Sequence, residues 1–101
     1  MIRVVYSTND DHYTKLDVRG HADFDEYGKD LICASVSSIV FGFMNAVDES
    51  KCDVKVKELN NHIEIINNSK SELIDNYFEL VLIQLKTIEE SYGEFVKVER
   101  K

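Results

Sequence analysis

Five short segments of the chain have the pattern of polar and apolar residues that is typical of β-strands. Tyr13–Arg19 is the clearest, because Thr14, Leu16 and Val18 alternate with polar residues and so share one face, which we expect to meet the core. Turn-forming residues separate the first two strands and the next two, so each pair is expected to form a hairpin. The predicted strands are Ile2–Ser7, Tyr13–Arg19, Asp53–Glu58, His62–Ile66 and Phe95–Val98.

Two longer segments have helical patterns. The first follows Asp30, a residue type favoured at the N-cap, and runs to about Ser50. Its apolar residues cover most of the circumference, so either the sheet with a second helix or a second subunit must bury it. The second helix is predicted to begin at the capping box Ser69-Lys70-Ser71-Glu72 and to end near Tyr92. The face expected to meet the core consists of Leu73, Tyr77, Leu80, Val81, Gln84, Leu85 and Ile88.

These elements predict one α/β domain of the α+β type over residues 1–101. The order β-β-α-β-β-α-β implies a mainly antiparallel sheet with two helices packed on it. A chain of 101 residues fits a single domain, and no proline, repeat or low-complexity segment marks a boundary within it.

The composition argues against two classes of partner. The net charge is −7 and no Lys/Arg cluster occurs, so direct nucleic-acid binding is not expected. The acidic surface favours a basic peptide or protein partner, or simply keeps the protein soluble. The longest near-apolar run, Leu31–Val47, contains four polar residues and is too short to span a bilayer. Because the first residues read as a strand and not as a signal peptide, we expect a cytoplasmic protein with no membrane partner.

The two cysteines, Cys33 and Cys52, are too few for a disulfide scaffold. They lie at opposite ends of the first predicted helix, about 28 Å apart at the usual helical rise, and therefore should not pair within one chain. Two thiols of this kind suit a reducing compartment.

The candidate chemistry gathers around Cys33, in the first turn of the first helix. A polar loop, Gly20–Lys29, leads into this helix, and His21 stands at the start of the loop. Asp30, Cys33 and Ser37 follow one stripe of the helix at i, i+3 and i+7. If the fold brings His21 to Cys33, the pair supplies the base and nucleophile of a cysteine hydrolase. The structural alternative is a capping Asp30, a small buried Cys33, and a Ser37 bonded to its own helix.

The energetics make His21 necessary to the functional interpretation. A free thiol has a pKa of about 8.5, and lowering it to about 7 requires about 2 kcal/mol. A helix N-terminus supplies only about 0.3–1 kcal/mol. A protonated imidazole beside the sulfur would supply the rest. His12 and His62 are weaker candidates, because their turn positions predict exposed side chains.

A metal site is the competing interpretation of the same region. Zinc sites usually present closely spaced ligand pairs such as C-x-x-C or H-x-x-x-H, and neither occurs. We therefore predict no metal and no cofactor. The donors that were considered are His21, Asp23, Asp25, Glu26, Asp30 and Cys33.

These motifs resemble the bacterial ribosomal-processing cysteine proteases. That family carries Gly-His-Ala, a short loop, and then Gly-x-Asp-x-x-Cys-Ala-x-x-Ser. The matching positions are Gly20-His21-Ala22, Gly28, Asp30, Cys33-Ala34 and Ser37. The resemblance covers essentially the whole chain, and Lys51–Lys70 is its least distinctive stretch.

The resemblance implies a cytoplasmic homodimer that removes a short N-terminal extension from a large-subunit ribosomal protein. It maps the nucleophile onto Cys33 and the general base onto His21, with Asp30 and Ser37 as supporting positions. Backbone N–H groups at the helix start would hold the oxyanion. The rival interpretations are a ribosome-assembly module that binds without cutting and a redox-sensing thiol.

The loop before the helix corresponds to a substrate-covering segment of that family. Its acidic residues would suit a basic stretch of substrate beside the cleaved bond. The loop residues expected to contact substrate are Gly20, Ala22, Asp23, Asp25, Glu26 and Gly28.

Overall fold

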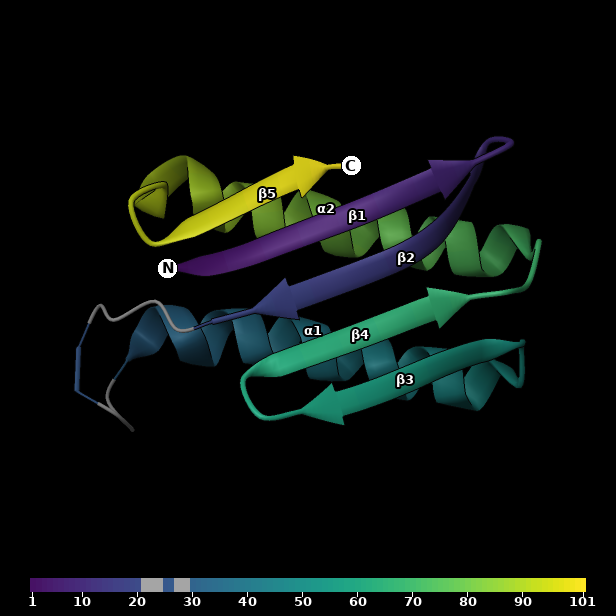
Figure 1. The fold of residues 1–101 in the computed structure, drawn as a ribbon, viewed down its shortest axis with the longest axis horizontal. Helices are drawn as coiled ribbons and strands as arrows, with labels where there is room; N and C mark the ends of the chain where they lie inside the picture. Colours follow the sequence, from purple (N-terminus) through teal and green to yellow (C-terminus); the bar gives the residue numbers. More distant parts are fainter. Residues whose placement is uncertain (21–24, 27–29) are drawn as a thin grey trace.

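One five-stranded sheet runs through the molecule, with its strands in the order β3-β4-β2-β1-β5 (Figure 1). The computed structural model describes residues 1–20, 25–26 and 30–101. Each of the five predicted strands is present, with its ends shifted by at most two residues. The strands are β1 (Ile2–Asn9), β2 (His12–Arg19), β3 (Val54–Leu59), β4 (His62–Asn67) and β5 (Val96–Arg100).

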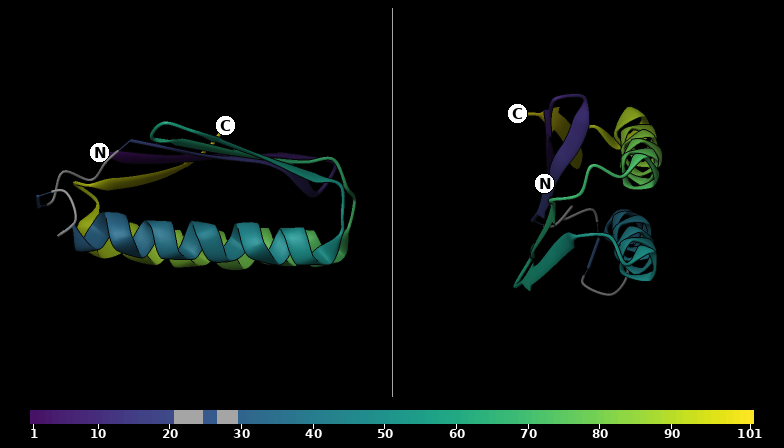
Figure 2. Two further views of the ribbon diagram at one scale, coloured as in Figure 1. Left: turned by 90° about the horizontal axis from the view of Figure 1, so that it is seen from below. Right: turned by 90° about the vertical axis from the view of Figure 1, so that its right-hand side faces the viewer.

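Two helices, α1 (Leu31–Ser50) and α2 (Glu72–Tyr92), lie side by side on one face of the sheet (Figure 2). By its length and its mean hydropathy of 1.6, α1 could cross a membrane, so the sequence argument against a span was too strong. The core helix of a folded domain meets the same criteria. The sheet and α2 are the partners that this apolar helix required. The buried residues of α1 are Ile32, Val36, Val40, Phe43 and Val47.

The sheet is mixed, because one of its neighbouring pairs is parallel. The hairpins β1–β2 and β3–β4 are antiparallel, and so is the central pair β2–β4 that joins them. Strand β5 lies parallel to β1, since α2 carries the chain back along the sheet before β5 begins. The predicted order and the mainly antiparallel pairing are both confirmed.

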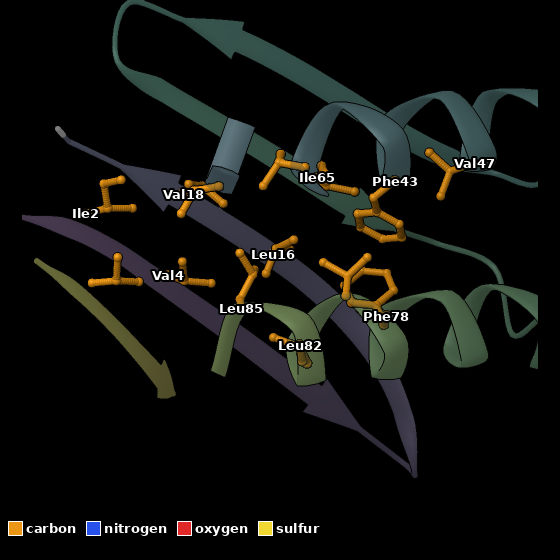
Figure 3. Packing of buried hydrophobic residues seen from close by; sticks show 14 of the residues in the cluster. Ile2, Val4, Leu16, Val18, Phe43, Val47, Ile65, Phe78, Leu82 and Leu85 are labelled. Carbon is orange, nitrogen blue, oxygen red and sulfur yellow. The ribbon is translucent and has the colours of Figure 1, made fainter. Parts of the chain in front are cut away.

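The sheet and the helices meet in one core, in which Phe78 of α2 lies beside Phe43 of α1 (Figure 3). Phe78 is fully buried; its ring stacks on Tyr13 with centroids 5.3 Å apart and meets Phe43 edge to face at 4.9 Å. Tyr13 reaches the helix side because the β1–β2 register shifts between Ser7 and Thr8. Such an irregularity moves a side chain to the opposite face of a sheet.

The side of α2 that meets the core agrees only in part with the predicted one, since Val81 and Leu85 are buried as expected. Leu73 and Leu80 are exposed, although both were placed on the core face. The helix also begins later than the predicted capping box, because Ser71 is the N-cap and its hydroxyl accepts a hydrogen bond from Ile74 N. The Ser69 hydroxyl instead donates to the side chain of Asn67. The buried residues of α2 are Ile74, Phe78, Val81, Leu82 and Leu85.

The orientation of α2 can be tested with two identical substitutions on one helix. Leu85 is fully buried and Leu80 is 56% exposed. We expect Leu85→Ala to lower the free energy of unfolding by about 2–5 kcal/mol, because it leaves a cavity in the core. Leu80→Ala should cost less than about 1 kcal/mol. Urea unfolding followed by circular dichroism measures both, and equal losses would contradict the observed orientation.

Candidate active site

Cys33 lies in the first turn of α1, where the carboxylate of Asp30 caps the helix. Asp30 has an extended backbone (φ −76°, ψ 100°), and its Oδ1 accepts from Ile32 N at 3.0 Å and from Cys33 N at 2.9 Å. The Asp30 carbonyl accepts from Ala34 N at 3.0 Å and begins the helical ladder. The predicted N-cap role of Asp30 is therefore confirmed.

This cap engages two of the backbone amides at the helix start, the region that was expected to hold an oxyanion. Ile32 N–H and Cys33 N–H both point to the Asp30 carboxylate, and Ala34 N–H is used by the helix itself. An N–H group that already donates to a carboxylate is a poor donor to a second anion. These three amides of the helix start therefore already have acceptors in the arrangement seen here, and the expected oxyanion role of the helix start stays a prediction.

A cavity of about 630 Å³ opens beside Cys33, and Asp30, Cys33 and Ser37 all line it. The polar stripe predicted on the helix thus faces a single hollow. Cys33 is a half-buried thiol. Ser37 is exposed, and its hydroxyl has no hydrogen-bond partner among the residues that the structure describes. The structural alternative expected a hydrogen bond from Ser37 to the backbone of its own helix. Ser35 makes a bond of this kind, since its Oγ donates to Leu31 O at 2.7 Å.

The β3–β4 hairpin forms the wall of the cavity opposite α1. Phe41, two turns beyond Cys33 on α1, adds an apolar surface that is 44% exposed. Sequence reasoning missed this wall, because only the strand order brings the hairpin to the start of α1 and its residue types carry no catalytic signal. The lining residues of the hairpin are Glu58, Leu59, Asn61, His62 and Ile63.

Gly20 fixes the start of the loop that leads to the helix. Its φ is +91°, a region that residues with a side chain rarely adopt, and an added Cβ would overlap the Met1 carbonyl oxygen. Gly20 N donates to Asn61 O at 3.0 Å, which ties the loop to the β3–β4 turn. The end of β2 is therefore held from two sides, immediately before His21.

Several predicted site residues lie outside the part of the chain that the structure describes, namely His21, Ala22, Asp23 and Gly28. Two acidic residues of the loop are described. Asp25 lines the cavity, and its Oδ1 accepts from Glu26 N at 2.7 Å. The cavity therefore has at least one carboxylate from the loop at its rim.

His62 is largely buried, contrary to the surface position expected for it. Its side chain is 18% exposed, and its Nε2 lies 3.0 Å from Asp17 Oδ1 and 4.0 Å from Glu64 Oε2. The contact with Asp17 is close but lacks the alignment of a good hydrogen bond. Glu64 belongs to the same strand as His62, and Asp17 belongs to β2, which pairs with that strand. Strand pairing alone therefore produces the cluster.

Asp17, His62 and Glu64 place three possible metal ligands within 4.8 Å of one another. However, Arg19 Nε already donates to Asp17 at 2.9 Å. Lys15 Nζ lies 3.6 Å from Glu64. Burial on its own would raise the pKa of the Asp17 carboxyl, but the hydrogen bonds from Arg19 and the close contact with His62 outweigh it and lower that pKa. Because the two cations balance the two carboxylates, we interpret the cluster as an ion-pair network that holds His62 in the cavity wall.

The remaining candidates lie away from Cys33. His12 Nδ1 is 2.6 Å from Asp75 Oδ2, so this histidine links the β1–β2 turn to the first turns of α2 and is not simply solvated. Tyr13 N also donates to Asp75, at 2.9 Å. Cys52 is a half-buried thiol just after α1 that packs against the core. Both sites are at the end of the sheet opposite the start of α1 (Figure 1).

The family model described as cysteine protease Prp matches residues 1–97. The chain belongs to the Prp family of cysteine proteases. Ribosomal processing cysteine protease Prp of Staphylococcus aureus is 34% identical, with all of both chains covered. The protein of the same name from Mycoplasma pneumoniae is 34% identical over 84% of this chain and 85% of that one. The resemblance found in the sequence motifs is thereby confirmed.

Solved Prp structures have the same fold. Crystal structures of the essential ribosomal processing protease Prp from S. aureus cover 100% of both chains. One, in complex with a covalently linked product peptide, has a TM-score of 0.89 at 31% identity. Another, in complex with a substrate peptide, has a TM-score of 0.88 at 29% identity.

The conformation of Gly20 gives a test of how the Prp-family loop is held. We expect Gly20→Ala to lower the free energy of unfolding by about 1–3 kcal/mol, because it places a Cβ in a left-handed backbone against Met1. Gly42→Ala is the matched control, since Gly42 lies in α1 with no atom near its Cβ position. That variant should gain about 0.5–1 kcal/mol of stability. Chemical denaturation measures both, and a neutral Gly20→Ala would contradict the left-handed backbone seen at Gly20.

Proposed function

We propose that this chain is a cysteine endopeptidase that removes a short N-terminal extension from a large-subunit ribosomal protein. The observation that carries the proposal is a half-buried thiol, Cys33, at a capped helix start that faces a cavity able to hold peptide. Relatives that align over the whole chain are named as ribosomal processing proteases, and solved structures contain substrate and product peptides. These names supply the substrate class, which the geometry alone does not.

In the proposed reaction, His21 takes the proton of the Cys33 thiol and the thiolate attacks the peptide carbonyl. His21 then gives this proton to the leaving amine, and a thioester with Cys33 remains. Water attacks the thioester, which releases the acid and restores the thiol. Asp30 holds the first turn of α1 in place, and Ser37 offers a hydroxyl to the bound peptide. The oxyanion is stabilised by donors other than the three capped or helical amides.

Single substitutions of the proposed dyad test the reaction. Cys33→Ala and His21→Ala should each abolish cleavage of candidate ribosomal-protein N-termini, because the nucleophile or its base is lost. Cys52→Ala is the matched control and should retain activity, since Cys52 does not line the cavity. Mass spectrometry of incubated peptides gives the readout.

The same experiment separates the enzyme from its rivals. Shortened peptide from the wild-type protein supports the protease, whereas persistent cleavage by Cys33→Ala would refute Cys33 as nucleophile. A stable complex of the wild-type protein with uncut peptide would instead indicate the ribosome-assembly module. Circular dichroism confirms that each variant is folded.

The proposal places the protein in the cytoplasm as a homodimer, without direct nucleic-acid or membrane contact. One chain already covers the inner side of α1, so the support for a dimer is now limited to exposed apolar residues such as Leu31, which is 71% exposed. Light scattering at micromolar concentration should give twice the monomer mass of 11.7 kDa. A monomer mass would contradict the dimer and leave the proposed reaction intact.

A further inference from the structure

We propose that a groove between α1 and β3 binds an extended segment of the substrate, and that Glu58 contacts a Lys or Arg side chain of that segment. This inference rests on the proposed peptidase function and names a specificity residue for it. Glu58 lies near the end of β3, in a part of the chain that carries no recognisable motif.

The groove continues past the cavity that contains Cys33. A second hollow of about 370 Å³ lies farther along α1, between Met44, Asn45 and Asp48 of the helix and Val56 and Glu58 of β3. Glu58 lines both hollows, so the two adjoin at this residue. Each hollow has residues of α1 on one side and residues of β3 on the other, and the proposed groove runs through both.

The length of this path suits an extended peptide. From Cys33 to Asp48, α1 rises by about 22 Å at 1.5 Å per residue. An extended chain advances about 3.3 Å per residue, so the groove accommodates about six to seven residues. The larger of the two hollows is the one at the Cys33 end.

The charges along the groove indicate what the segment carries. Asp25, Asp48 and Glu58 line it, and no Lys or Arg is among its described lining residues. Glu58 is exposed and takes part in no ion pair with another described residue. Its neighbours Lys55 and Lys57 belong to the opposite face of β3, because side chains alternate along a strand. A basic side chain in the groove would therefore meet negative charge without a competing cation.

The experiment uses the Cys33→Ala protein, which cannot turn over the probe. Fluorescein-labelled twelve-residue peptide libraries carry Lys, norleucine or Glu at one fixed position, and fluorescence anisotropy measures binding. We expect Lys to be favoured over Glu by about 2- to 5-fold at one position or two adjacent ones, the strength of a single exposed ion pair. Added salt should reduce this preference.

Substitutions of Glu58 identify the residue responsible. Glu58→Gln should remove the preference for Lys, and Glu58→Lys should reverse it in favour of Glu at the same position. Glu90→Lys is the matched control, because Glu90 is an exposed residue of α2 that lines neither hollow. It changes the net charge equally and should keep the wild-type preference. The proposal is overturned if Glu58→Lys and Glu90→Lys behave alike.

Kinetics separate this inference from the proposed function. In the otherwise wild-type enzyme, Glu58→Lys should raise KM for a Lys-containing peptide and leave kcat unchanged, since the contact is remote from the sulfur. If Glu58→Lys cleaves the peptide with unchanged KM, the groove proposal is contradicted and the protease function is not. If peptide affinity depends on the residue at position 58 but no ribosomal-protein peptide is cleaved, the groove proposal is supported and the proposed function is contradicted.

Discussion

The hydrogen bonds from the first turn of α1 to the Asp30 carboxylate set the position of Cys33. Because one oxygen accepts from both Ile32 N and Cys33 N, the turn that carries the thiol is held against fraying. The same negative charge partly cancels the positive end of the helix dipole near the sulfur. A helix start that is well ordered in this way is less able to stabilise a thiolate by itself. In the proposed mechanism, more of the activation of Cys33 would therefore have to come from the imidazole base.

α1 contributes residues both to the hydrophobic core and to the cavity. One side of it supplies the core with residues such as Val36 and Val40, while the next stripe supplies the cavity with Cys33 and Ser37. Val36 belongs to both, since it is buried and also lines the cavity. The hydrophobic packing that stabilises the domain thus also fixes the geometry of the site. Loosening the core near the helix start would displace the thiol relative to the β3–β4 wall.

Local periodicity was sufficient to predict one half of the site. Asp30, Cys33 and Ser37 share a stripe because helical geometry alone puts them there, and the structure places all three on one cavity. The opposite half was not predictable, because Glu58 and His62 reach the cavity only through the order of the strands. His62 was misjudged for the same reason, since its carboxylate neighbour Asp17 belongs to a strand 45 residues earlier in the chain.

The fold shows the same division between local and long-range determinants. The strands and helices were recovered from alternation and capping residues, with small shifts at their ends. Tyr13 lies on the helix side because of a register shift that no pattern of residue types announces. The orientation of α2 was likewise ambiguous, since apolar residues such as Leu80 and Leu82 occur on both of its sides, and packing against the sheet decided which side is buried.

The close approach of Met1 to Gly20 has a practical consequence for work with this enzyme. The Met1 carbonyl occupies the space that a side chain at Gly20 would need, and the amino terminus lies at the end of the sheet where the loop and α1 begin (Figure 1). An affinity tag fused ahead of Met1 would emerge at this end of the sheet, close to the cavity beside Cys33, whose lining includes Ile2. Lys101 follows β5, at the edge of the sheet farthest from the β3–β4 hairpin, so a fusion there leaves the site accessible.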